Sequence, residues 1–186
     1  MNTVEPSQLI SESIAGDEHA IEALLRQYET GVYRLALSIV DDASDANEVT
    51  QETFIAALRS LRNYQEKSSF KAWLYTIALN ISRSHLRKRR IFGRLRETLK
   101  GIFQVETQKP PDLEDEIIQN EEDAAVWNSL NKLDERHRMV VVLRYFQDLP
   151  VAEIAEILSI SEGTVHSRLH NAREKLRTVL AQFNRD

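Results

Sequence analysis

The sequence contains no cysteine, and it has only five glycines and four prolines among its 186 residues. The chain therefore has no disulfide, no thiol sensor and no cysteine-ligated zinc or iron–sulfur site, and a cytoplasmic location is the simplest expectation. The few glycines and prolines supply little of the turn chemistry that strands and hairpins require. No run of about 18 apolar residues is present, and the first residues show no basic segment followed by an apolar one. We therefore expect neither a membrane-spanning helix nor a secretory signal.

Apolar residues recur at helical spacing through most of the chain, whereas no convincing alternating run indicates a strand. In the first half this spacing predicts four helices, over residues 6–16, 17–39, 45–61 and 70–90. Gly31 is expected to interrupt the second of them. Polar residues suited to capping stand before several predicted helices, namely Asp17, Ser68 or Ser69, Asp134 and Ser161.

The helical pattern fades in the middle of the chain, where Pro110 and Pro111 lie among acidic residues. Such a stretch is typical of an extended and partly disordered linker. We therefore predict an all-α fold with two small helical domains, at residues 1–91 and 122–186, joined by a flexible linker at residues 92–121.

Charge is distributed in blocks, although the net charge of the whole chain is only −5. Residues 1–66 carry a net charge of −8, and residues 67–101 carry +9. Residues 102–125 carry −7, and residues 126–186 carry +1. Neighbouring blocks of opposite sign indicate separate surfaces that bind separate partners.

Residues 151–176 show the pattern of a helix-turn-helix. Two apolar stripes at helical spacing form its core: Ile154, Ala155 and Leu158, then Val165, Leu169, Ala172 and Leu176. The second helix of such a motif enters the major groove of DNA, so its polar face is expected to bind bases and phosphates. That face carries Thr164, His166, Ser167, Arg168, His170, Asn171, Arg173 and Lys175. Its two histidines are spaced as zinc ligands can be, but no third ligand follows, and no metal site is expected.

The predicted helix at residues 70–90 ends in a basic run that suits phosphate binding: Arg83, Arg87, Lys88, Arg89 and Arg90. Aromatic and amide side chains accompany it, and such a combination suits single-stranded nucleic acid. Trp73 lies on the apolar stripe and is expected in the core. Tyr75 and Asn80 lie off the stripe and are expected to be free to contact a ligand.

The predicted helix at residues 45–61 has the opposite character, because Asp45, Glu48, Gln51 and Glu52 lie on its polar side. These acids cannot bind DNA phosphates. A plain solvated face and a docking surface for a basic protein partner are both open from the residues alone.

Three segments in this order resemble the bacterial sigma factors of the extracytoplasmic-function group, which are initiation subunits of RNA polymerase. The segments are DANEVTQETFIAALRSL, SSFKAWLYTIALNISRSHLRKRR and LPVAEIAEILSISEGTVHSRLHNAREKL. The resemblance covers about residues 18–91 and 122–182, which correspond to the family's regions two and four. It implies a factor that binds core polymerase, recognises the −10 and −35 promoter elements and assists melting, controlled by an anti-sigma protein that nothing in the chain identifies.

The resemblance assigns roles to particular residues. Docking on a coiled coil of the polymerase's largest subunit is implied for Asp45, Glu48, Gln51, Glu52 and Phe54. Recognition of the −10 element, partly as single-stranded DNA, is implied for Asn63, Tyr64, Trp73, Tyr75, Asn80, Arg83 and Arg87. Recognition of the −35 element in duplex DNA is implied for Thr164, His166, Ser167, Arg168, Asn171 and Arg173. The family commonly has Lys and Arg where this chain has His166 and Asn171, so the −35 sequence cannot be transferred from relatives.

Two other classes of function account for less of the sequence. A stand-alone helix-turn-helix regulator explains residues 150–180 but leaves the acidic and basic helices without a role. A metal-dependent nuclease would need convergent acids, and the sequence shows no such pattern, no phosphate-binding glycine loop and no nucleophile–base pair. We therefore expect no catalysis by this chain and no cofactor.

Overall fold

The computed structural model describes residues 6–65, 69–103 and 129–183, and it describes the side chains of residues 7–65, 69–92 and 129–178. All regular elements within these residues are helices. The first half contains α1 (Pro6–Ala15), α2 (Glu18–Val40), α3 (Ala43–Ser60), the 3-10 turn η1 (Leu61–Asn63) and α4 (Phe70–Phe103). The second half contains α6 (Glu135–Val141), the π-helical turn η2 (Val142–Phe146), α7 (Val151–Leu158) and α8 (Glu162–Phe183). The predicted all-α fold is confirmed.

Polar side chains begin the helices where the sequence predicted caps. The Asp17 carboxylate accepts hydrogen bonds from the first turn of α2, and the Ser69 hydroxyl accepts one from Ala72 at the start of α4. Asp134 caps α6, and the Ser161 hydroxyl accepts the Thr164 amide in α8. Each cap satisfies a backbone donor that the helix itself leaves unpaired.

Two boundaries differ from the prediction. The second helix is continuous through Gly31. Close packing around Gly31 outweighs the low helix propensity of glycine. Helix α4 does not end at Arg90 but continues to Phe103, through a stretch that contains no proline. The remainder of the predicted linker, from residue 104 onward, lies outside the described residues.

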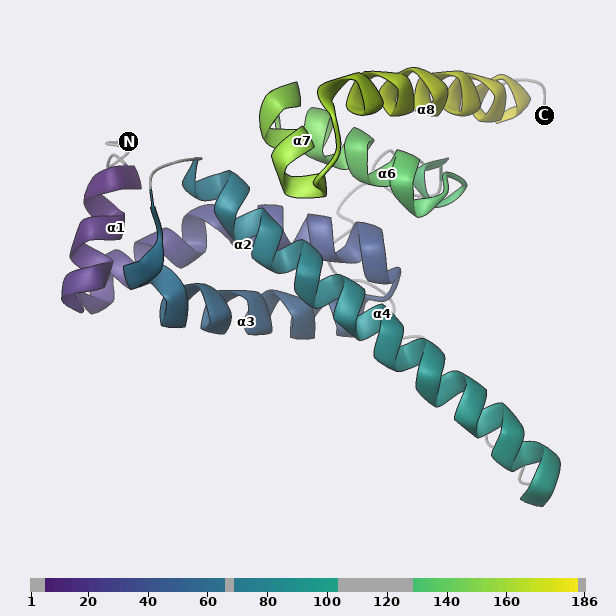
Figure 1. Cartoon of the computed structure of the whole chain (residues 1–186), viewed down its shortest axis with the longest axis horizontal. Helices are drawn as coiled ribbons and strands as arrows, with labels where there is room; N and C mark the ends of the chain where they lie inside the picture. Colours follow the sequence, from purple (N-terminus) through teal and green to yellow (C-terminus); the bar gives the residue numbers. More distant parts are fainter. Residues whose placement is uncertain (1–5, 66–68, 104–128, 184–186) are drawn as a thin grey trace.

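Helices α1–α4 form an N-terminal bundle in which α2, α3 and α4 pack against one another and α1 packs on α2. Figure 1 shows α4 crossing this bundle and projecting beyond it. The core contains fully buried side chains from each long helix, among them Leu35 of α2, Val49 of α3 and Leu74 of α4. This burial supplies the main free energy of folding.

Helices α6–α8 form a C-terminal bundle that packs against the N-terminal one. Helix α7 contacts α4, and α2 contacts both α6 and η2. One cluster of buried apolar side chains continues across both bundles. The two predicted units therefore lie in contact in this structure, which the sequence did not reveal. None of the described helices combines the length and apolar character needed to cross a bilayer.

Asp134 joins two helices of the C-terminal bundle as well as capping one. Its carboxylate accepts the His137 amide at 3.2 Å, lies 2.7 Å from His137 Nδ1 and accepts from Lys175 Nζ of α8 at 3.2 Å. Burial acts to raise the pKa of Asp134, but the hydrogen bonds from His137 and Lys175 prevail and lower it from 3.8 to about 2. The ionised carboxylate is therefore favoured in the folded chain.

We expect Asp134→Ala to lower the free energy of unfolding by about 1 kcal/mol, the usual contribution of an N-cap. Solvent screens the ion pair with Lys175, because both side chains are 49% exposed. A carboxyl whose pKa is lower in the folded state stabilises above its ordinary pKa, and this contribution fades as pH falls toward about 2. Urea unfolding across the acid range measures it. Glu156→Ala, which removes an exposed acid of α7, is the control and should change little.

Candidate functional site

The polar side of α3 forms an acidic ridge made of Asp45, Glu48, Gln51 and Glu52. The last three side chains are exposed, and Asp45 is partly buried in the first turn. The spacing of these residues along the helix keeps them on one side, while Val49 and Ala57 on the other side enter the core. The acidic ridge is thus a solvent-facing surface of negative charge.

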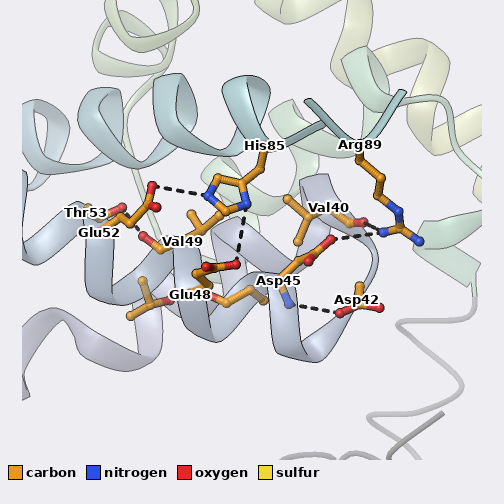
Figure 2. A network of polar contacts seen from close by, with 11 residues as sticks. Val40, Asp42, Asp45, Glu48, Val49, Glu52, Thr53, His85 and Arg89 are labelled. Atoms are coloured by element: carbon orange, nitrogen blue, oxygen red, sulfur yellow. Dashed lines mark hydrogen bonds and ion pairs between the residues drawn. The ribbon is translucent and has the colours of Figure 1, made fainter. Parts of the chain in front are cut away.

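Two side chains of α4 hold this ridge in place (Figure 2). The His85 ring places Nε2 3.2 Å from a Glu52 oxygen and Nδ1 4.0 Å from a Glu48 oxygen. Arg89, one helical turn further, donates to Asp45 at 3.1 Å and to the Val40 carbonyl at 3.4 Å. Sequence reasoning missed His85, although its i, i+4 spacing to Arg89 places both on one face of α4.

Asp45, Glu48 and His85 are also the one group within the described side chains that could hold a metal ion. Their ligand atoms all lie within 4.8 Å of one another, a convergence that the sequence did not predict. Arg89 already occupies the Asp45 carboxylate, and His85 faces Glu52. These contacts account for the cluster as ion pairs and polar contacts between α3 and α4.

Phe54 is assigned to docking by the resemblance, but its side chain turns away from the acidic ridge. It is partly buried against the core and lines a small apolar recess together with Leu24, Leu58 and Phe70. In this structure Phe54 therefore packs against the core side of α3 and is not part of the acidic ridge.

An aromatic cluster joins η1 to the start of α4. The Tyr64 ring lies 5.2 Å from Trp73 and 5.5 Å, edge-on, from Phe70, and Tyr28 of α2 lies 5.3 Å from Phe70. Trp73 and Tyr64 are half-buried, in accordance with the expectation that Trp73 packs on the core. Both residues thus remain partly exposed, and Asn63, which precedes Tyr64 in the chain, is exposed.

The expectation that Tyr75 is free to contact a ligand is wrong. Only 1% of Tyr75 is exposed, because its ring lies where α4 meets α2 and the C-terminal bundle. Its hydroxyl donates to the side-chain oxygen of Gln147, which is 4% exposed. Burial, and next the neighbouring Tyr28, raise the pKa of the Tyr75 phenol above its ordinary value. An amphipathic pattern could not show this, since the second surface that covers Tyr75 comes from a distant segment.

The other polar residues predicted to read the −10 element are exposed on α4. Asn80, Arg83 and Arg87 all reach solvent. Arg83 lies 3.8 Å from Glu135 of α6, so one predicted DNA contact has an acidic neighbour across the bundles. The basic run is therefore divided, because Arg89 turns to α3 while Arg87 faces outward.

The second helix of the predicted helix-turn-helix is α8, and its apolar stripe is buried as expected except at Leu176, which is partly buried. Val165, Leu169 and Ala172 face α6 and α7, with exposures of 0–6%. The turn before it is formed by Ser159 in the left-handed region, at φ 53°. The predicted reading face remains outward: His166, Ser167 and Asn171 are exposed, and Thr164 and Arg168 are partly exposed.

Arg173 is exposed on the same helix, but it contacts a residue that sequence reasoning missed. The Tyr145 hydroxyl of η2 accepts from Arg173 Nε at 3.0 Å and from a second guanidinium nitrogen. The guanidinium carbon also lies 5.7 Å from the Tyr145 ring centroid. Tyr145 itself is 51% exposed, so this pair forms part of the surface beside α8.

The same two units correspond to known families. Residues 24–91 match the family described as Sigma-70 region 2, and residues 129–178 match Sigma-70, region 4. The chain is 32% identical to the RNA polymerase sigma-H factor of Pseudomonas aeruginosa, over 98% of this chain and 97% of that protein. It is 30% identical to the ECF RNA polymerase sigma factor SigW of Bacillus subtilis, over 89% and 91%.

A solved structure adds a likeness in three dimensions. The sigma factor RpoE of Bartonella quintana, crystallised in complex with the anti-sigma factor NepR, superposes with a TM-score of 0.65. The two chains are 26% identical, and the match covers 84% of this chain and 94% of the other.

The bundles and their order define a two-domain transcription initiation factor of the sigma-70 type. The chain belongs to the extracytoplasmic-function sigma factors. As such it binds core RNA polymerase and promoter DNA, and it directs the polymerase to specific promoters.

We expect Tyr75 to resist nitration by tetranitromethane under conditions that modify Tyr145. Tyr75 is buried and its pKa is raised, which disfavours the reactive phenolate, whereas half of Tyr145 is exposed. Mass spectrometry of peptides from the folded chain provides the measurement. Equal nitration of the two tyrosines in the native protein would contradict the burial described above. The control is the unfolded chain, in which both tyrosines should be modified.

Proposed function

We propose that the acidic ridge of α3 is the surface that docks on a coiled coil in the largest subunit of core RNA polymerase. The observation that supports this most directly is the exposure of Glu48, Gln51 and Glu52 on one face of a rigid helix. His85 and Arg89 hold the acids in a fixed arrangement, which reduces the entropy lost on binding. Attraction to a basic partner would also speed the encounter.

We propose that the −10 element is recognised by the aromatic cluster and the outward face of α4. Half-buried Tyr64 and Trp73 offer rings against which an unstacked base can lie. Asn63 precedes Tyr64 in the chain, and Asn80 and Arg87 lie further along α4; all three are exposed and offer donors for bases and phosphates. Extrusion of a base costs a few kcal/mol, which such contacts offset.

We propose that α8 reads the −35 element from the major groove. Its first two turns present Thr164, His166, Ser167 and Arg168 at the surface, with Asn171 one turn further. The division of labour then follows the two domains: residues 1–91 bind polymerase and the −10 element, and residues 122–186 bind the −35 element. Where the family commonly has Lys and Arg, this face carries His166 and Asn171, so it has fewer permanent positive charges and phosphate anchoring contributes less to its affinity.

We further propose that the chain is cytoplasmic, has no catalytic activity of its own and is held inactive by an anti-sigma protein. The support for such a partner is the relative from Bartonella quintana, which was crystallised with an anti-sigma factor. Since this chain has no cysteine, any thiol-based signal would be sensed by that partner.

We expect Gln51→Ala combined with Glu52→Ala to weaken binding to core polymerase about tenfold or more, because both exposed side chains lie in the proposed interface. Fluorescence anisotropy of the labelled chain with core polymerase measures the affinity. The matched control is Gln27→Ala with Glu29→Ala, which removes the same two side-chain types from an exposed position on α2. Unchanged affinity in a folded α3 variant would refute the docking assignment.

Arg168→Ala should lower run-off transcription from cognate promoters while affinity for core polymerase stays the same. Loss of one base or phosphate contact corresponds to a decrease of roughly 5- to 100-fold in duplex binding. Arg177→Ala is the control, because Arg177 lies further along α8 and pairs with Glu174. Promoters are found first by transcribing a genomic library with and without the chain. A loss of core binding in the Arg168 variant would contradict the division between the two domains.

A further inference from the structure

Tyr145 of η2 and Arg173 of α8 form an exposed pair on the C-terminal bundle. The Tyr145 hydroxyl accepts from Arg173 Nε at 3.0 Å and also from Nη2, and the guanidinium carbon lies 5.7 Å from the ring centroid. Tyr145 is 51% exposed, and Arg173 is exposed as well. A cation–π contact at such exposure adds little to the stability of the fold, so packing alone does not account for the pair.

The contact with Tyr145 occupies one edge of the Arg173 guanidinium and leaves another edge open. Nε and one hydrogen of Nη2 form the occupied edge, while Nη1 and the other hydrogen of Nη2 form the open one. No other group within the described residues accepts a hydrogen bond from this side chain. Two parallel N–H donors on one edge match two oxygens of a phosphate, and arginine binds phosphate in this bidentate way. Arg173 is thus held with a phosphate-binding edge free.

Arg173 is also a cation that no acid neutralises. Lys175 and Arg177, the next cations along α8, lie 3.2 Å and 2.9 Å from carboxylate oxygens. Among the side chains that the structure describes, no acid lies within ion-pair distance of Arg168 or Arg173. A permanent charge without a counter-ion on an exposed helix attracts the phosphates of DNA.

The position of Arg173 on α8 places it beside the residues proposed to read DNA. It follows His166 by seven residues and His170 by three, so the three side chains share one flank of the helix. All three are exposed. When a helix enters the major groove, its outermost side chains lie next to the phosphate backbone, and contacts there fix the orientation of the helix.

We propose that Tyr145 is a positioning residue for DNA binding, which holds Arg173 so that the open edge of the guanidinium binds a backbone phosphate beside the −35 element. This inference rests on the proposed role of α8. A free arginine side chain loses conformational entropy when it binds, and a guanidinium already held in place loses less. The effect is important here because α8 has few other permanent positive charges without an acidic partner.

The test replaces single phosphates of a cognate promoter duplex by uncharged methylphosphonates. It measures the affinity of the holoenzyme formed from the full-length chain and core polymerase. We expect one methylphosphonate beside the −35 element to weaken binding by the wild-type chain about tenfold, because it removes a charged hydrogen-bond partner. The same methylphosphonate should have little effect on Arg173→Ala, whose salt dependence should also decrease by about one phosphate contact.

Tyr145→Phe keeps the ring and removes the hydroxyl that holds the guanidinium. It should lower the affinity of the holoenzyme for the unmodified duplex roughly two- to tenfold, the usual effect of one hydrogen bond. Because Tyr145 acts through Arg173, this loss should disappear in a chain that also carries Arg173→Ala. Arg177→Ala is the matched control, since Arg177 lies one turn further on the same flank and pairs with Glu174. It should leave the affinity and the response to each methylphosphonate unchanged.

Circular dichroism establishes that each variant is helical. Wild-type affinity in a folded Tyr145→Phe holoenzyme, or an equal loss with and without Arg173, would overturn the inference. A loss of affinity for core polymerase in Tyr145→Phe would also overturn it, because the pair would then contact protein and not DNA. A wild-type holoenzyme that is indifferent to replacement of the whole −35 element would refute the proposed role of α8, and this inference with it.

Discussion

Helix α4 contacts other helices on several of its sides, and these contacts constrain the rest of the structure. Its apolar stripe, including Leu74 and Ala78, fills the space between α2 and α3. A second side holds the acidic ridge through His85 and Arg89, and its first turns meet α7. Only what remains can face DNA. One helix thus contributes to the core, holds the acidic ridge and carries the surface proposed to read DNA.

The separation of charge along the sequence has a spatial counterpart. The acidic first block and the basic block that follows it meet where α3 and α4 pack side by side, and there Arg89 pairs with Asp45 while His85 lies between two glutamates (Figure 2). The strongest charges therefore neutralise one another in part within the N-terminal bundle. The exposed remainder, acidic on α3 and basic on α4, gives the bundle two surfaces of opposite sign for partners of opposite sign.

Local patterns predicted most of the fold because local physics determines most of it. The caps at Asp17 and Asp134 and the stripes of the helix-turn-helix each depend on residues within one or two helical turns. The errors come from longer-range effects. Gly31 looked like a break because its use, close contact with a segment more than a hundred residues away, is not visible locally. Tyr75 looked free for the same reason.

The candidate surfaces, like the fold, could be predicted where they depend on local pattern and not where they depend on contacts between distant residues. The exposed residues of the acidic ridge and of α8 could be named from amphipathic spacing, since a side chain opposite an apolar stripe must face outward. The residues that contact them could not be named from the sequence. The contact of Arg173 with Tyr145 joins residues 28 apart in the chain, and the contact of Glu52 with His85 joins residues 33 apart. Such pairs depend on how helices cross and not on the pattern within either helix.

The π-helical turn η2 contains an added residue, and this added length affects the orientation of the helices that follow it. A π turn contains one residue more than an α turn, and here the Gln147 amide bonds to the Val142 carbonyl, five residues back, at 3.1 Å. In a regular α-helix each added or removed residue rotates everything after it by about 100°. A chain one residue shorter at this point would keep both bundles but present a different side to α2. The rotational phase of the helix-turn-helix relative to the N-terminal bundle thus depends on a single added residue.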